Sequence, residues 1–232
     1  MSEKIKISVS DGSTMQIHVY RPKRPKAPAI MVHPEAFGVD AHIRDVAERL
    51  SNEGYLTVAP EAFHRTAPPD YEGSYEDFSK AMPHFEALTI AAMEADLKAT
   101  YDWIKNDKQA ESNKTATIGF CLGGRLSFLA NGLFPLKAAI SFYGGRIAPD
   151  LLDRVPKQSG PIMFFWGGLD KHIGLEQPRV LSDAMLKAGK SFRDVVMSDA
   201  DHGFFNNGKK IYNEKASKEA WALSLAFFKN NL

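Results

Sequence analysis

The sequence predicts an α/β fold built on a mostly parallel sheet. Short apolar runs typical of strands alternate along the chain with stretches of helical periodicity. The apolar runs are continuous, as expected for strands that are covered on both faces. The chain has 232 residues, enough for one well-buried core. We therefore expect a single domain over residues 1–232, with helices on both faces of the sheet and an antiparallel hairpin at the N-terminus.

Local patterns define the elements in chain order. Alternating runs over 4–9 and 15–20 flank an Asp-Gly-Ser turn and predict the hairpin. A helical stretch over 40–53 stops at Gly54, which is suited to a C-cap. Residues 60–83 are rich in proline and predict an irregular segment or partial lid. The remaining predicted strands are 29–33, 55–59, 115–120, 138–143, 161–166 and 193–198, and the remaining helices are 86–106, a stretch from about 122, 175–189 and 213–230.

The charge and composition narrow the function classes. Lys and Arg number 29 against 28 Asp and Glu, so the net charge is +1, and no block of like charge occurs. Nucleic acids and membrane surfaces both require a basic face, so we expect neither as a partner. We see no signal peptide and no long apolar run, and we expect a cytoplasmic protein. The chain has 1 cysteine, which cannot form an internal disulfide.

Residues 119–124 carry the main functional signal. They read GFCLGG between a predicted strand and a predicted helix. This matches the nucleophile elbow G-x-S-x-G of the α/β-hydrolase fold, with Cys121 in place of serine. Glycines at 119 and 123 permit the tight turn, and the helix N-terminus favours both a thiolate and an oxyanion at the Leu122 N–H. The alternative is a chance match with Cys121 in the core, but the strand-to-helix junction favours the nucleophile.

A base and an acid follow Cys121 in the chain order of this fold. Histidines after Cys121 are His172 and His202, and His202 comes just after the last predicted strand. Asp170 lies in a Gly-Gly-Leu-Asp turn after the preceding strand, where its carboxylate could orient an imidazole. Asp199 and Asp201 are competing acids, and each residue alone also fits an ordinary loop role. We expect Cys121, Asp170 and His202 to form the catalytic triad.

The loop after 29–33 reads PEAFG and is expected to supply the second oxyanion-hole N–H, from Ala36. Glu35 would lie at the mouth of the site, where a carboxylate tends to keep the thiol protonated. A solvated loop glutamate is the alternative. The other histidines lack metal-ligand spacing such as H-E-x-x-H, so no metal site is expected, and His33 is a candidate to line the site.

The sequence resembles the dienelactone hydrolase family. The resemblance spans nearly the whole chain, through HPEAFGVDAHIRDVAERLSNEGYLTVAPEAF, IGFCLGGR, WGGLDKHI and DADHGFF. It implies the α/β-hydrolase fold and hydrolysis of dienelactone by a Cys-His-Asp triad without a cofactor. It further implies that Glu35 interacts with the resting thiol. By the same resemblance, the amides of Leu122 and Ala36 form the oxyanion hole, and Phe37 and Tyr143 are aromatic residues of the pocket.

One position departs from the family pattern. Well-known members carry an arginine four residues after the catalytic histidine, where it holds the substrate carboxylate, and this chain has Asn206. Arg65 lies in the region that supplies a second family arginine. Since Asn cannot replace a bidentate arginine clamp, the substrate is left open.

The sequence thus favours a cofactor-independent hydrolase of small esters or lactones, similar to dienelactone hydrolase (carboxymethylenebutenolidase) and acting as a monomer or homodimer. The alternative is a non-catalytic protein of the same fold that binds a ligand or partner. A serine esterase is disfavoured because no G-x-S-x-G occurs in the chain.

Overall fold

The computed structural model describes residues 2–232. The chain divides into two compact units. The boundary lies between Thr115 and Ala116, inside strand β5 (Ala110–Phe120). The expectation of a single domain stays a prediction. Within the described residues no helix is long and apolar enough to cross a membrane.

The first unit contains a mixed sheet in the order β1-β2-β4-β3. The N-terminal hairpin is confirmed: β1 and β2 are antiparallel, with Glu3 opposite Val19. β2 is also antiparallel to β4, whereas β3 and β4 are parallel. Both parallel strands are buried along their whole length, as their continuous apolar sequences predict. The bounds are β1 (Glu3–Ser8), β2 (Thr14–Tyr20), β3 (Ala27–His33) and β4 (Leu56–Pro60).

Helix α1 (Ala41–Asn52) follows β3 and shows how local sequence sets its ends. Asp40 is the N-cap and its carboxylate accepts the Ile43 N–H at 3.0 Å. At the other end Gly54 has φ 98° and donates its N–H to Ser51 O, while Tyr55 N–H donates to Leu50 O. This is the Schellman arrangement, so the predicted stop at Gly54 is confirmed.

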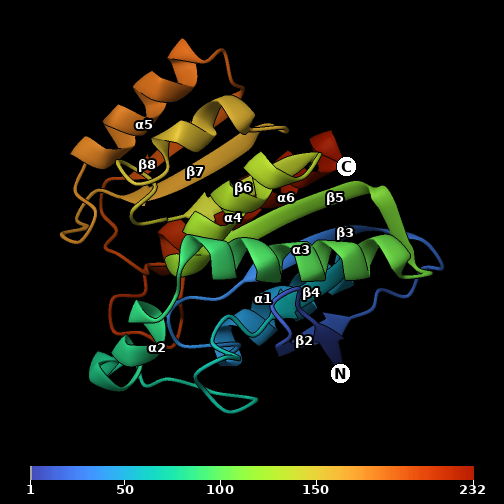
Figure 1. Ribbon diagram of the computed structural model, residues 1–232. Helices are drawn as coiled ribbons and strands as arrows, with labels where there is room; N and C mark the ends of the chain where they lie inside the picture. Colours follow the sequence, from blue (N-terminus) through green and yellow to red (C-terminus); the bar gives the residue numbers. More distant parts are fainter. Residues whose placement is uncertain (1) are drawn as a thin grey trace. The chain divides into compact units, whose positions relative to one another are not determined.

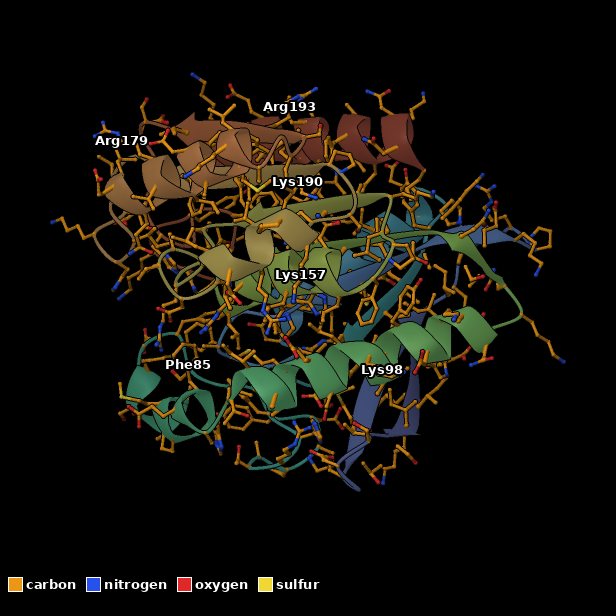
Figure 2. The ribbon with its side chains drawn as sticks, turned by 45° about the horizontal axis from the view of Figure 1, so that its top comes forward. Phe85, Lys98, Lys157, Arg179, Lys190 and Arg193 are labelled. Carbon is orange, nitrogen blue, oxygen red and sulfur yellow. The ribbon has the colours of Figure 1, made fainter. Side chains whose placement is uncertain are left out.

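The segment after β4 is irregular, as predicted, but it also contains two short helices that the sequence did not reveal. These are η1 (Phe78–Lys80) and α2 (Met82–Glu86). In Figure 1, α2 lies at the start of the long helix α3 (Ile90–Asn106). Lys98, labelled on α3 in Figure 2, is exposed and pairs with Asp102.

The second unit holds a fully parallel set of strands in the order β5-β6-β7-β8. In Figure 1, α4 lies in front of β6 and the dark red α6 passes behind it, so helices cover both faces. A short 3₁₀ helix, η2 (Leu152–Lys157), was not predicted. The other bounds are β6 (Ala138–Phe142), β7 (Ile162–Gly167), β8 (Phe192–Met197), α4 (Leu122–Leu133), α5 (Glu176–Lys187) and α6 (Glu214–Asn231).

These parallel strands place four loops at one edge of the second unit. In such sheets, ligands bind beyond the carboxyl ends of the strands. The residues that follow the four strand ends include Cys121, Tyr143, Asp170 and His202. Beneath them the rings of Phe120 and Phe165 stack on Phe142 at 4.8 and 4.4 Å between centroids. The strand ends that carry these residues therefore pack around a core of stacked aromatic rings.

Candidate active site

Cys121 forms the turn between β5 and α4. Its backbone has φ 54° and ψ −110°, a strained conformation that residues with a side chain rarely adopt. The Cys121 N–H donates to Phe142 O of the neighbouring strand at 3.0 Å and anchors the turn. The thiol is free and partly buried. The strand-to-helix junction predicted for the elbow is thus observed.

Glycines make this turn sterically possible. A Cβ on Gly119 would overlap the backbone of Gly123. A Cβ on Gly124 would lie 2.7 Å from Phe142 O and 2.8 Å from the Cα of Gly144. These obstacles are mainly backbone atoms, so no change of rotamer would relieve the overlaps. The first turn of α4 therefore packs directly on β5 and on the loop after β6.

Helix α4 begins immediately at Cys121. The N–H groups of Gly124 and Arg125 donate to Cys121 O at 3.0 and 3.3 Å. Leu122 is the first residue of the helix, so its own N–H has no partner within the helix. An unpaired N–H at the positive end of a helix is suited to stabilising an oxyanion.

His202 links Cys121 to Asp170. Its Nδ1 lies 2.7 Å from Asp170 Oδ2, and its ring also hydrogen-bonds the Cys121 side chain. The Asp170 side chain is almost fully buried, with 3% of its area exposed, and that of His202 is 15% exposed. Because Nδ1 is held by the carboxylate, Nε2 is the ring nitrogen left for the thiol.

The second oxygen of Asp170 is also engaged. Oδ1 accepts the N–H groups of His172 and Ile173 at 2.8 and 3.0 Å, which fixes the carboxylate toward His202. Of the competing acids, Asp201 accepts the backbone N–H of His202 at 2.7 Å. Asp199 is exposed. Neither makes the imidazole contact that Asp170 makes.

The charges of this cluster support one another. Burial disfavours a charged imidazole, but the charge of Cys121 and the hydrogen bonds of the ring with Asp170 and Cys121 outweigh it and raise the pKa of His202 to about 10. Burial likewise disfavours the Asp170 carboxylate. The hydrogen bond and charge of His202, with the two backbone N–H groups, nevertheless hold the pKa of Asp170 below its usual value. The arrangement stabilises a positive charge on the His202 imidazole beside the Asp170 carboxylate.

Two further rings contact His202. Tyr143 is fully buried, and its backbone has φ 37°. The centroid of its ring lies 5.1 Å from the centroid of the His202 imidazole. His172, an exposed residue, packs edge-on against it at 5.3 Å. The contact of His172 was not predicted, because it depends on how the loop after β7 folds back around Asp170.

Comparison with known proteins extends this picture. The family model described as "Dienelactone hydrolase family" matches residues 15–232. A Synechocystis sp. protein named "Putative carboxymethylenebutenolidase" is 32% identical over 213 residues, which cover 88% of this chain and 87% of that protein. A protein of the same printed name from Escherichia coli is 31% identical over 235 residues and covers 95% and 84%.

The chain belongs to the dienelactone hydrolase family. A solved structure named "Putative Dienelactone Hydrolase" from Klebsiella pneumoniae subsp. pneumoniae is similar, with 29% identity, a TM-score of 0.87 and 99% of each chain covered. The α/β-hydrolase fold expected from the elbow motif is confirmed by this likeness. Membership makes the protein a hydrolase that acts on ester or lactone bonds.

The remaining family positions lie in the first unit. Glu35 and Ala36 follow β3 and are buried, with 0% and 4% of their area exposed. Phe37 is also buried, and its ring packs edge-on against Tyr75 at 5.0 Å and Phe78 at 6.0 Å. A Cβ on Gly38, which has φ 80°, would overlap the Tyr71 carbonyl. The loop is therefore closely packed within its own unit, which excludes the solvated alternative for Glu35.

Asn206, which stands where the family carries an arginine, and Arg65, in the region of the second family arginine, both make hydrogen bonds within the fold. Asn206 is fully buried, and its Oδ1 accepts the Gly208 N–H at 2.9 Å. Arg65 forms a fork to Asp96, with Nη1 and Nη2 at 2.8 and 2.7 Å, and its Nε lies 2.7 Å from Asp11. Both side chains stabilise the fold where they stand.

His33, the candidate lining residue, is completely buried, and burial lowers its pKa to about 3. A separate group in the first unit has ligand atoms close enough for a metal: His18, Glu61 and Asp70, within 4.8 Å of one another. Lys4 lies 2.7 Å from Asp70 Oδ1, and the Gln16 amide donates to both carboxylates. The Lys4 ammonium already pairs with one of the two carboxylates, so the cluster fits a structural network better than a metal site.

Proposed function

We propose that the protein is a cofactor-independent hydrolase of small esters or lactones, with Cys121 as nucleophile, His202 as acid and base, and Asp170 orienting His202. The observation that carries the proposal is the hydrogen-bonded series Asp170–His202–Cys121, in which Asp170 Oδ2 and His202 Nδ1 are 2.7 Å apart. A buried carboxylate, an imidazole and a thiol in this order match the arrangement that activates acyl-transfer nucleophiles.

The first half-reaction forms a thioester. The Cys121 thiolate attacks the carbonyl carbon, a C–S bond forms, and negative charge moves to the carbonyl oxygen. When the tetrahedral intermediate collapses, the C–O bond to the alcohol breaks. The His202 imidazolium gives its Nε2 proton to the leaving alkoxide. In a lactone that alcohol remains attached to the acyl group.

The second half-reaction releases the acid. His202, now neutral, removes a proton from water as the water oxygen attacks the thioester carbonyl. Collapse breaks the C–S bond and regenerates the thiolate beside the imidazolium. Asp170 stays ionised throughout, keeps the ring in one tautomer and stabilises its positive charge. The lowered pKa of Asp170 and the raised pKa of His202 support these roles.

The proposed oxyanion hole has two donors. Leu122 supplies an N–H at the start of α4, and Ala36 supplies the second from the loop after β3. Phe37 and Tyr143 are proposed as aromatic pocket residues, and the contact of Tyr143 with His202 supports that role for the second of them. Glu35, buried and carboxylate-bearing, is proposed to interact with the resting thiol until substrate binds.

Hydrolysis rates of Cys121 variants test the proposal. We expect wild-type protein to hydrolyse p-nitrophenyl acetate and a small lactone, and Cys121→Ala to lose on the order of 10³-fold or more in kcat/KM. An exposed-site variant, Asp199→Asn, serves as the control and should match wild type. Equal activity of Cys121→Ala and wild type would overturn the proposal, because the thiol would then have no part in turnover.

A further inference from the structure

His172 combines an exposed position with a contact to the His202 imidazole. The two ring centroids are 5.3 Å apart, and the ring planes are inclined at 69°. Tyr143, which also packs against His202, is fully buried, whereas His172 is exposed. In an edge-on pair at least one face of the outer ring stays free for a further planar group. His172 is therefore suited to contact both the proposed base and a bound molecule.

The backbone around His172 is held in place. The N–H groups of His172 and Ile173 donate to Asp170 Oδ1 at 2.8 and 3.0 Å. Ile173 is buried, and a Cβ on Gly145, in the loop after β6, would lie 3.9 Å from its Cγ1. These anchors are backbone groups and a neighbouring side chain, so a substitution of the His172 ring leaves them intact. The turn itself therefore fixes where the ring lies.

The proposed chemistry brings the leaving alcohol close to this ring. When the acyl C–O bond breaks, His202 gives its Nε2 proton to the leaving alkoxide, so that oxygen lies about 3 Å from Nε2. Other sides of His202 are engaged, because Asp170 holds Nδ1 at 2.7 Å and the buried Tyr143 packs on the ring. An aromatic ring attached to the leaving oxygen is large enough to reach from Nε2 to the exposed His172.

We propose that His172 is a specificity-determining residue that stacks against the leaving group and favours esters of aromatic alcohols. The inference rests on the proposed function and adds the class of leaving group. Stacking on His172 stabilises an aromatic alcohol beside the departing oxygen, whereas a small alkyl alcohol has no ring face to offer. The preference acts in acylation alone, because the alcohol of an ester has left before water attacks the thioester.

The kinetic test compares phenyl acetate with 2,2,2-trifluoroethyl acetate. Both esters have activated leaving groups and leave the same acetyl group on Cys121, but only the first carries a ring. We expect His172→Ala to lower the phenyl-to-trifluoroethyl ratio of kcat/KM about 3- to 10-fold, and His172→Phe, which keeps a ring, to retain the wild-type ratio. Lys171→Ala, at the exposed neighbour on the same turn, should also retain it. An unchanged ratio in His172→Ala would overturn the inference.

The deacylation rate separates selectivity from a purely structural role. Loss of the acetyl group from the acylated protein is followed by intact mass. We expect wild type and His172→Ala to deacylate at rates within about twofold of each other, because Asp170 and the buried Tyr143 still hold His202. If deacylation slowed as much as acylation, His172 would only support the imidazole and the inference would fail. An active wild-type protein that never carries an acetyl group on Cys121 would instead reject the proposed function.

Discussion

The proposed chemistry depends on one imidazole more than on any other side chain. The Nδ1 atom of His202 hydrogen-bonds the Asp170 carboxylate, and the same ring hydrogen-bonds the Cys121 side chain. Tyr143 and His172 pack on its faces and edge, so the ring has little freedom to turn away. Restricting the ring in this way keeps Nε2 directed to the reacting centre without a rotation during turnover.

At this scale Asp170→Asn tests the orienting role. The amide cannot supply the same charge to the imidazolium, and its NH₂ group favours the wrong tautomer of His202. We expect kcat for p-nitrophenyl acetate to fall on the order of 10²- to 10⁴-fold, with little change in folding. Asp199→Asn is the matched control. If both variants kept wild-type kcat, Asp170 would have no role in orienting the base.

The raised pKa of His202 gives a stability prediction with a definite sign. A group whose folded pKa is raised, here to about 10 from the usual 6.5 of a histidine, stabilises the fold fully below the lower of these two values. That contribution is lost as the pH rises through the folded pKa. We expect urea denaturation to show a larger difference in unfolding free energy between wild type and His202→Ala near pH 6 than near pH 10.5. A difference that is constant or grows with pH would contradict the shift.

At the scale of elements, the site depends on strand ends and a strained elbow. The left-handed backbone at Cys121 is held by the hydrogen bond to Phe142 and by the close approach of Gly119 to Gly123. Such strain persists only where the surrounding structure fixes it. Substitutions that separate β5 from α4 should therefore affect folding and activity together.

Gly119→Ala tests this packing. The added Cβ would meet the backbone of Gly123, so we expect the free energy of unfolding to fall by about 1–3 kcal/mol or more. Gly145→Ala is the control, since its Cβ would have no atom closer than 3.9 Å and we expect a change within about 0.5 kcal/mol. Urea denaturation measures both. Similar stability losses in the two variants would show that the elbow is not tightly packed.

The sequence predicts elements well where a local pattern decides them. The DGS turn, the apolar strands and the Gly54 stop each depend on residues next to one another, and all appear in the structure. The start of β5 at Ala110 and the helices α2 and η2 were missed. These depend on where the chain packs, since polar residues open β5 and prolines lie within or beside both helices.

At the scale of the whole molecule, residues differ in whether the sequence alone could reveal their contacts. Cys121, Asp170 and His202 could be selected because motif and chain order point to them. The contacts of Arg125 and Arg146 with Asp150 could not be predicted, because nothing local indicates that one carboxylate would face two arginines. The hydrogen-bond partners of Arg65 and Asn206 could not be predicted either, because tertiary packing determines them.

Glu35 belongs to the first unit and Cys121 to the second, so its proposed role is a property of the whole chain. A carboxylate near the thiol disfavours the thiolate. We therefore expect Glu35→Gln to raise the rate of Cys121 alkylation by iodoacetamide severalfold. Glu72→Gln, at an exposed carboxylate paired with Arg44, should leave the rate unchanged. An unchanged rate in Glu35→Gln would remove Glu35 from the resting site.

The central claim is that Cys121 becomes acylated during turnover. Mixing the protein with excess p-nitrophenyl acetate and quenching in acid should trap one acetyl group per chain, visible by intact mass. Because the chain has 1 cysteine, peptide mapping identifies the site without ambiguity. We predict acetylation of the peptide that carries Cys121, with none in Cys121→Ala and blockage by prior alkylation. Acetylation confined to another residue, in a protein that still turns over the ester, would contradict the account.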